Sequence, residues 1–215
     1  MRILVTGSSS GIGLAIARKF LAEGHEVVGL DVARTILVHP RYTHVIGDIR
    51  TVDATRIPEP DILINNAGTL EESEAIDVNL TGTIRLTQQL VDSPRLQSVL
   101  FVASASARNG AEFPMYVASK AGIIGYMKNL ALALAPRGIT CNSISPGGVI
   151  TPANRHILND GHLYRAVLAE TLLGKWAEAS EVAELAYFLT VINQSMTGED
   201  VLMDNGEMLK SNFIW

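Results

Sequence analysis

A tyrosine and a lysine stand four residues apart in the segment MYVASKAG, as Tyr116 and Lys120. On a helix, residues i and i+4 lie on one face, one turn apart, so we expect the phenol and the ammonium to be neighbours. A phenol has a pKa near ~10 and is a poor base at neutral pH, but a fixed ammonium lowers that pKa. The pair could then protonate a carbonyl oxygen or deprotonate an alcohol. Taken alone, the spacing also fits a half-buried tyrosine beside a surface lysine.

A glycine-rich loop, TGSSSGIG, contains Gly7, Gly11 and Gly13. Glycine permits a tight turn and lets the backbone approach a pyrophosphate closely. An apolar-faced helix is expected to follow, and its free N–H groups and dipole favour phosphate at that end. The loop therefore predicts a dinucleotide site, although glycines also simply end strands.

Asp31 ends the second apolar run, about twenty residues beyond the loop. A carboxylate there can accept both hydroxyls of the adenosine ribose and would repel a 2′-phosphate. We therefore expect NAD as the cofactor, with NADP as the alternative. Arg34 weakens that preference because it lies nearby, and a solvated acid at a strand end is the simpler interpretation.

Two serines, Ser104 and Ser106, follow the apolar run in FVASAS. A serine hydroxyl at the end of a strand can hold a substrate oxygen. Small residues there also allow a tight turn, and for Ser106 we favour that second interpretation.

Short apolar runs alternate with helical stretches along the whole chain. Continuous apolar strands of this kind favour a parallel sheet covered on both faces, and the right-handed crossover rule favours a doubly wound topology. We therefore predict an α/β fold, with a Rossmann-type parallel sheet of about seven strands and helices on both faces, as one domain over residues 1–215. Ligands are expected beyond the carboxyl ends of the strands. The predicted strands are 2–7, 25–31, 43–48, 61–68, 97–106, 139–147 and 199–204, and the predicted helices are 11–24, 73–91, 114–135 and 179–190, the last with Ser180 as its N-cap.

Composition narrows the class of protein. Apolar residues make up 47% of the 215, and the net charge is −5, so disorder and nucleic-acid binding are not expected. A single cysteine, Cys141, rules out an internal disulfide, and the five scattered histidines give no ligand spacing for a metal. No apolar stretch approaches the ~20 residues of a membrane span. We expect a cytoplasmic protein without metal.

Taken in order, the motifs resemble those of the short-chain dehydrogenase/reductase family, and they run through nearly the whole chain. The matching segments are TGSSSGIG, NNAG at 65–68, VNLTG at 78–82, YVASK at 116–120 and SPGGVITP at 145–152.

The resemblance implies an oxidoreductase that transfers a hydride between a nicotinamide cofactor and an alcohol or carbonyl substrate. It implies that Tyr116 is the general acid and base, and that Lys120 lowers its pKa and holds the nicotinamide ribose. It further implies that Ser104 orients the substrate oxygen and that Asn79 anchors a water linking Lys120 to solvent. The cofactor-binding residues that it implies are Gly7, Ser10, Gly11, Ile12, Gly13, Asp31, Asp48, Ile49, Asn66, Ala67, Gly68, Tyr116, Lys120, Pro146, Val149 and Thr151.

The chain departs from the family pattern in several ways. Ser104 lies twelve residues before Tyr116, one short of the usual spacing, so Ser106 stays in reserve. The segments between Gly47 and Asp61 and between Asn66 and Asn79 are also short, which puts the walls of the pocket in doubt.

Other interpretations remain. One is a catalytically silent NAD(P)-binding regulator on the same fold; another is an epimerase or dehydratase, which would need a longer C-terminal part. The helix over 114–135 is apolar nearly all round, and in the family such helices pair across a two-fold axis, so a homodimer or homotetramer is expected. The tail LKSNFIW is expected to contribute to an interface.

Overall fold

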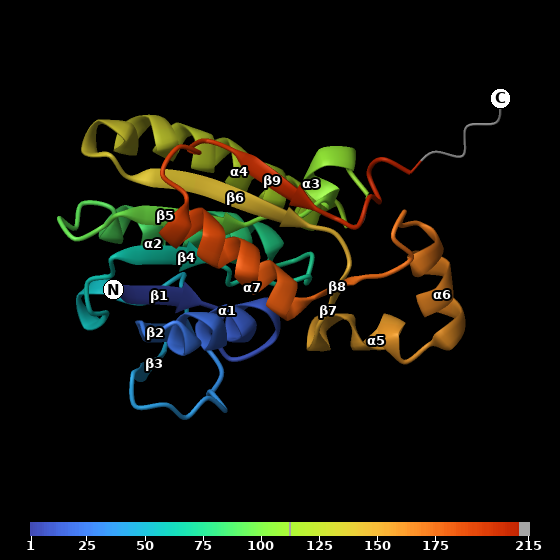
Figure 1. The fold of residues 1–215 in the computed structure, drawn as a ribbon, viewed down its shortest axis with the longest axis horizontal. Helices are drawn as coiled ribbons and strands as arrows, with labels where there is room; N and C mark the ends of the chain where they lie inside the picture. The colour runs from blue at the N-terminus through green and yellow to red at the C-terminus, as the bar shows by residue number, and fades with distance from the viewer. Residues whose placement is uncertain (112, 211–215) are drawn as a thin grey trace.

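Seven strands form the central sheet of the computed structural model, which describes residues 1–111 and 113–210. They are β1 (Arg2–Thr6), β2 (Glu26–Asp31), β3 (Tyr42–Ile46), β4 (Ile62–Asn65), β5 (Ser98–Val102), β6 (Thr140–Pro146) and β9 (Asp200–Met203). Their order is β3-β2-β1-β4-β5-β6-β9, and every neighbouring pair is parallel (Figure 1). The strand order reverses between β1 and β4, which is the switch point where doubly wound sheets bind ligands.

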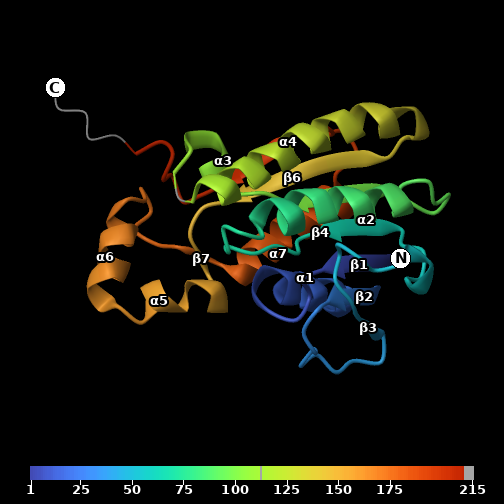
Figure 2. The ribbon, with the colours of Figure 1, turned by 180° about the vertical axis from the view of Figure 1, so that it is seen from behind.

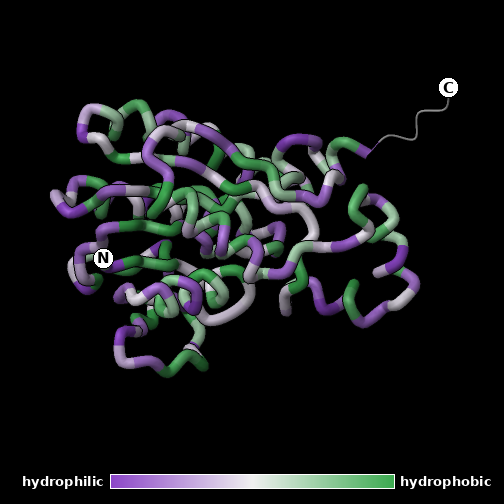
Figure 3. The backbone as a smooth tube through the Cα atoms, viewed as in Figure 1, coloured by the Kyte–Doolittle hydropathy of each residue, from purple (hydrophilic) through white to green (hydrophobic). Residues whose placement is uncertain are grey.

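Helices cover both faces of the sheet, as predicted. On one face lie α1 (Gly11–Ala22) and α7 (Ala179–Tyr187); on the other lie α2 (Thr83–Leu90) and α4 (Pro114–Leu134) (Figures 1 and 2). Alternating strand residues feed two cores: Ile3 and Val5 pack on the α1 side, and Leu4 packs on the α4 side. Hydrophobic segments accordingly concentrate in the central strands (Figure 3).

A smaller lobe stands beyond the carboxyl ends of the strands (Figure 1). It follows β6 and was not predicted, because its elements are too short to leave a periodic pattern. Its members are β7 (Val149–Ile150), α5 (Arg155–Leu158), α6 (Gly161–Ala169) and β8 (Ala177–Glu178), with β7 pairing with β8. The remaining elements are α3 (Ser106–Asn109), the 3₁₀ turns at Ala54–Arg56, Ala135–Arg137 and Pro152–Asn154, and π-helical segments at Ile76–Gly82 and Phe188–Ile192.

Several expected boundaries were wrong, among them the end of the fourth strand, which lies at Asn65 and not at Gly68. The fifth strand ends at Val102, and Ser106 already belongs to α3, so the serines lie beyond the strand. The N-cap of α7 is Glu178, not Ser180: its backbone is extended, and its N–H donates to Glu181 Oε2 at 2.8 Å in a capping box. The sequence misled here because serine is the more usual N-cap residue.

Within residues 1–111 and 113–210, none of the helices combines the length and apolarity that crossing a bilayer requires. In the same part of the chain, no three histidine, cysteine or acidic side chains gather as a metal site would need. The end of the tail LKSNFIW, expected at an interface, falls in residues 211–215 and lies outside the described residues.

Candidate active site

Tyr116 and Lys120 lie one turn apart near the start of α4, where Pro114 occupies the first helical position that proline favours. The Nζ atom of Lys120 is 5.7 Å from the centroid of the Tyr116 ring. The structure thus brings together the two groups whose spacing suggested proton transfer.

Lys120 is a buried cation, with only 6% of its surface exposed. Its ammonium donates a hydrogen bond to Val102 O at 2.8 Å, at the end of β5. Burial lowers the pKa of Lys120 from 10.5 to about 8 because the charged form loses its hydration. The ammonium is therefore still the main form at neutral pH, and a fixed positive charge near the ring favours the phenolate of Tyr116.

Ser104 and Ser106 are both buried and bonded to one another. The hydroxyl of Ser106 donates to Ser104 Oγ at 2.9 Å, and the Ser106 N–H points to the same oxygen at 3.3 Å. A hydroxyl oxygen accepts about two hydrogen bonds. With both taken, the O–H of Ser104 is left to donate to another oxygen. Between them, Ala105 N–H donates to Pro146 O at 2.8 Å and ties this turn to the end of β6.

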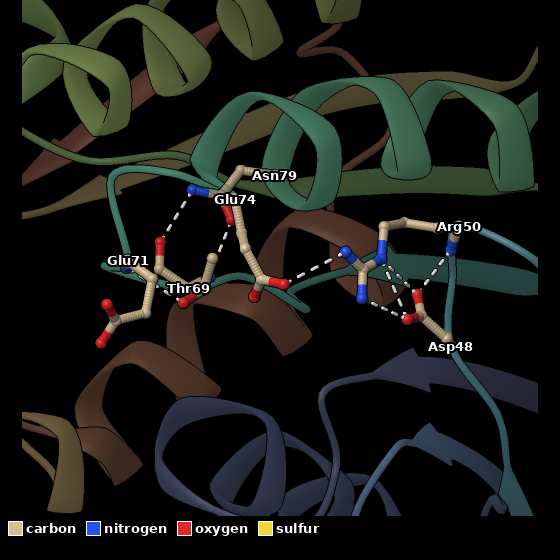
Figure 4. A network of polar contacts seen from close by, with 6 residues as sticks. All are labelled: Asp48, Arg50, Thr69, Glu71, Glu74 and Asn79. Atoms are coloured by element: carbon tan, nitrogen blue, oxygen red, sulfur yellow. Dashed lines mark hydrogen bonds and ion pairs between the residues drawn. The ribbon is translucent and has the colours of Figure 1, made fainter.

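Asn79 joins the segment after β4 to α4. Its Oδ1 accepts from Thr69 N–H at 2.7 Å, and its Nδ2 donates to Thr69 O at 3.0 Å (Figure 4) and to Ser119 Oγ at 3.1 Å. Ser119 in turn donates to Tyr116 O at 2.7 Å. Asn79 lies in the π-helical segment Ile76–Gly82, an irregularity frequent at functional sites.

Gly68 lies close to the polar ends of the Asn79 and Lys120 side chains. A Cβ atom added there would stand 3.1 Å from Asn79 Oδ1 and 3.5 Å from Lys120 Nζ. Asn79 and Lys120 therefore converge on the backbone that follows β4, even though they come from different helices.

The glycine loop forms a cradle at the start of α1, where Gly7, Gly11 and Gly13 leave the backbone without side chains. Gly7 and Gly11 have φ of +67° and +51°, which glycine adopts readily, and a Cβ at Gly13 would stand 2.0 Å from Gly7 O. A Cβ at Gly11 would be 3.5 Å from Thr151 Cβ, so the loop faces the segment after β6. Ser10 is the N-cap of α1. This bare backbone beside a helix N-terminus fits a dinucleotide pyrophosphate.

Asn66 locks the same loop to β4. Its Nδ2 donates to Thr6 O at 3.0 Å and to Gly7 O at 3.2 Å. The N–H groups of Asn66 and Ala67 both donate to Thr6 Oγ1 at 3.0 Å. These bonds hold NNAG beside the glycine cradle.

Asp31 reaches back to the glycine loop. Its carboxylate accepts Ser9 N–H at 2.9 Å and Ala33 N–H at 2.8 Å. Asp31 is therefore tied to the glycine loop through the backbone of Ser9.

Ser8, Tyr42 and His44 form a hydrogen-bonded chain that sequence reasoning missed. Tyr42 OH lies 3.1 Å from Ser8 Oγ and 3.0 Å from His44 Nδ1, and His44 Nε2 donates to Ala33 O at 2.9 Å. A Cβ at Gly29 would stand 2.0 Å from Tyr42 OH. A glycine inside a buried strand was the one signal of this close approach.

Asp48 is paired with Arg50 (Figure 4). Arg50 Nε and a terminal nitrogen lie 2.9 and 2.7 Å from Asp48 Oδ2, and this contact holds the pKa of Asp48 below its ordinary value. The same guanidinium lies 3.4 Å from Glu74. The side chains of Ile49 and Val149 are buried in the cores, so a ligand would meet these two residues at their backbone.

Comparison with known proteins gives a consistent result. A family model described as enoyl-(acyl carrier protein) reductase matches residues 50–207. Short chain dehydrogenase adrF of Penicillium roqueforti is 32% identical over 244 aligned positions, which cover 94% of this chain and 95% of that protein. The alignment is longer than the 215 residues here, so the relative carries residues that this chain lacks.

Two solved structures with a bound cofactor share the fold. A putative 2-deoxy-D-gluconate 3-dehydrogenase from Agrobacterium tumefaciens, with NADP bound, has a TM-score of 0.87 and 28% identity and covers 97% of this chain and 96% of its own. A 4-hydroxyisoleucine dehydrogenase complexed with NADH has a TM-score of 0.88 and 25% identity and covers 98% and 99%.

Proposed function

The chain belongs to the short-chain dehydrogenase/reductase family of NAD(P)-dependent oxidoreductases, and from that premise we propose that Tyr116 is the general acid and base of a hydride transfer on an alcohol or carbonyl substrate. The observation that carries the proposal is the buried ammonium of Lys120, 5.7 Å from the Tyr116 ring. A nicotinamide bound at the glycine cradle would supply or accept the hydride.

In this proposal each of the four side chains has a defined role. In the direction of carbonyl reduction, Tyr116 OH gives its proton to the carbonyl oxygen, and in oxidation the phenolate takes the proton of the alcohol. Lys120 stabilises the phenolate by its charge and holds the ribose of the cofactor. Ser104 donates its free O–H to the substrate oxygen. Asn79 fixes the backbone of Tyr116 through Ser119 and anchors a water that links Lys120 to solvent.

The substrate class is tested with the purified protein and panels of compounds. Carbonyl compounds are mixed with NADH or NADPH, and alcohols with NAD or NADP, while absorbance at the nicotinamide band is followed. Turnover of an alcohol–ketone pair supports the proposal. Tight cofactor binding without turnover on a broad panel would favour the second candidate, a silent NAD(P)-binding regulator, although that candidate leaves the intact set of polar groups around Tyr116 unexplained.

The serine assignment is tested with the same substrate. We propose Ser104 as the residue that touches substrate and Ser106 as the residue that fixes its hydroxyl, because both donors of Ser106 reach Ser104 Oγ. Ser104→Ala should lower kcat/KM by at least about 100-fold, whereas Ser106→Ala should cost about 3- to 10-fold, the worth of one hydrogen bond. The reverse ranking would make Ser106 the substrate contact.

NAD is proposed as the preferred cofactor, on the support of Asp31. Homologues bind NADH or NADP, so family membership alone does not decide the preference. Asp31→Asn removes the charge but keeps an acceptor for the loop N–H groups, and Asp31→Ala removes both. If the charge repels a 2′-phosphate, both variants should narrow the ratio of NAD to NADP affinity, measured by fluorescence titration. An unchanged ratio in both would remove Asp31 from this role.

We also propose that residues 1–215 act as one domain, that the partner at the site is a small molecule and not a nucleic acid, and that the chain forms a homodimer or homotetramer. The seven-stranded sheet supports the first point, because it contains both β1 from the start of the chain and β9 from near its end.

A further inference from the structure

The N-cap side chain of α4 does not accept hydrogen bonds from the N–H groups of the first turn. Its N-cap residue is Phe113, whose backbone is extended (φ −76°, ψ 129°) and whose side chain cannot accept a hydrogen bond. The N–H groups of a first helical turn need acceptors from outside the helix. Pro114 has no N–H, and Val117 N–H donates to Phe113 O at 2.9 Å. Two donors remain, the N–H groups of Met115 and Tyr116.

Glu72 accepts both of these donors. Each of its carboxylate oxygens lies 3.2 Å from Met115 N, and Oε1 lies 3.3 Å from Tyr116 N. A residue more than forty positions earlier therefore does what a serine or aspartate at the N-cap usually does. Its negative charge also lies at the positive end of the helix dipole.

Glu72 comes from the short segment between β4 and α2. That segment is held at Thr69 by Asn79, and Glu71 N–H donates to Thr69 Oγ1 at 3.1 Å. Further along, Glu74 contacts Arg50 (Figure 4). The carboxylate of Glu72 therefore links the segment that is bonded to Asn79 with the turn that carries Tyr116.

We propose that Glu72 is a positioning residue, which ties the segment 69–76 to the first turn of α4 and so fixes Tyr116 relative to Asn79 and Gly68. The inference rests on the proposed role of Tyr116. Displacement of a reacting group by about 1 Å can cost a large factor in rate, so the tie matters beyond the stability of the helix.

Glu72→Ala is the first variant to measure. It should lower kcat about tenfold, with a smaller effect on KM, and lower Tm by about 2–4 °C through loss of the cap. Glu72→Gln keeps a carbonyl oxygen at the same reach and should return kcat to within about threefold of wild type. Glu71→Ala is the matched control, because it removes the neighbouring charge while Figure 4 shows that side chain extending away from the network around Arg50.

A second variant separates the tie from simple capping. Phe113→Asp places an acceptor at the N-cap itself, where the extended backbone suits one. In the Glu72→Ala background it should restore Tm but leave kcat low, because a local cap does not rejoin segment 69–76 to α4. Recovery of both Tm and kcat would reduce Glu72 to a cap and overturn the proposal, as would an unchanged kcat in Glu72→Ala.

Amide hydrogen exchange tests the tie without any turnover. Peptides from the segment 69–76 should exchange faster in Glu72→Ala and in the double variant than in wild type. Unchanged exchange there overturns the inference even in an active enzyme. If wild type turns over no substrate but the exchange rises as described, the proposed function fails while the tie between the two segments stands.

Discussion

At the scale of single residues, the candidate site depends on a charged side chain that is buried away from water. Lys120 is the clearest case: a buried amine whose ammonium donates a hydrogen bond to Val102 O. Burial lowers its pKa to about 8, a shift that corresponds to about 3 kcal/mol of lost stability for the charged form. The protein tolerates that cost beside Tyr116, where a positive charge favours the phenolate.

Lys120→Met should therefore stabilise the cofactor-free protein while removing activity. At pH 7 we expect a gain of about 1–3 kcal/mol in the free energy of unfolding, measured by urea denaturation. The folded-state pKa lies below the unfolded value of 10.5, so the unfolded chain binds more protons between these values and the wild type gains stability as pH rises. The advantage of the variant should then shrink from about pH 8 to about pH 10.5.

The control for this prediction is Lys128→Met, on the exposed side of the same helix. It should change stability by less than about 0.5 kcal/mol at any pH in that range. A Lys120→Met variant that is less stable than wild type at pH 7 would contradict the account of a costly buried charge.

At the scale of elements, the sequence predicted the seven strands and four long helices because each carries a continuous apolar run or a helical period. It could not predict the turn of α3 that brings Ser106 onto Ser104, nor the π-helical segment around Asn79. Both depend on contacts with distant parts of the chain. The contact of Glu72 with the turn of Tyr116 could not be predicted either, since no local sequence pattern links the two residues.

The turn that carries the serines is anchored by an ion pair between the partly exposed Arg108 and the buried Asp200. Arg108 of α3 donates to Asp200 Oδ2 at 2.7 and 2.9 Å, and the hydroxyls of Ser143 and Ser145 donate to Asp200 Oδ1 at 2.6 and 2.8 Å. The Asp200 side chain is only 7% exposed. The pair thus connects α3 to β6 and β9.

Asp200→Ala should destabilise the protein by about 3 kcal/mol, because it leaves a cation and two buried hydroxyls without their acceptor. Urea denaturation should show a lower midpoint with an unchanged slope. The exposed neighbour provides the control: Glu199→Ala should stay within about 0.5 kcal/mol of wild type. Equal effects from the two variants would show that the ion pair does not stabilise this turn.

At the scale of the whole molecule, the loops that hold the candidate site lie together at one edge of the sheet, where the parallel strands have their carboxyl ends. The short segment between β4 and α2 and the lobe after β6 flank this edge (Figures 1 and 2). The segments between Gly47 and Asp61 and between Asn66 and Asn79 are short, yet Asn79, Tyr116 and Lys120 still lie together. We expect the lobe after β6 to determine which substrate binds.

The outer side of α4 carries Leu132, which is 78% exposed. If two copies pair through this helix, as predicted, the mass of the wild type measured by analytical ultracentrifugation should be twice 23.1 kDa or more. Leu132→Arg should shift the population toward 23.1 kDa, since a charge buried at such an interface is costly. A wild type that is monomeric at micromolar concentrations would contradict the assembly.

The most direct test of the account is Tyr116→Phe, which removes one oxygen atom from the site. With the substrate found in the panels, wild-type oxidation should rise with pH through an apparent pKa below the ~10 of free tyrosine. The variant should lose at least about 100-fold in kcat, while its affinity for the nicotinamide cofactor, measured by fluorescence titration, stays within about twofold. A variant that keeps more than about a tenth of the wild-type kcat would show that Tyr116 is not the acid and base of this site.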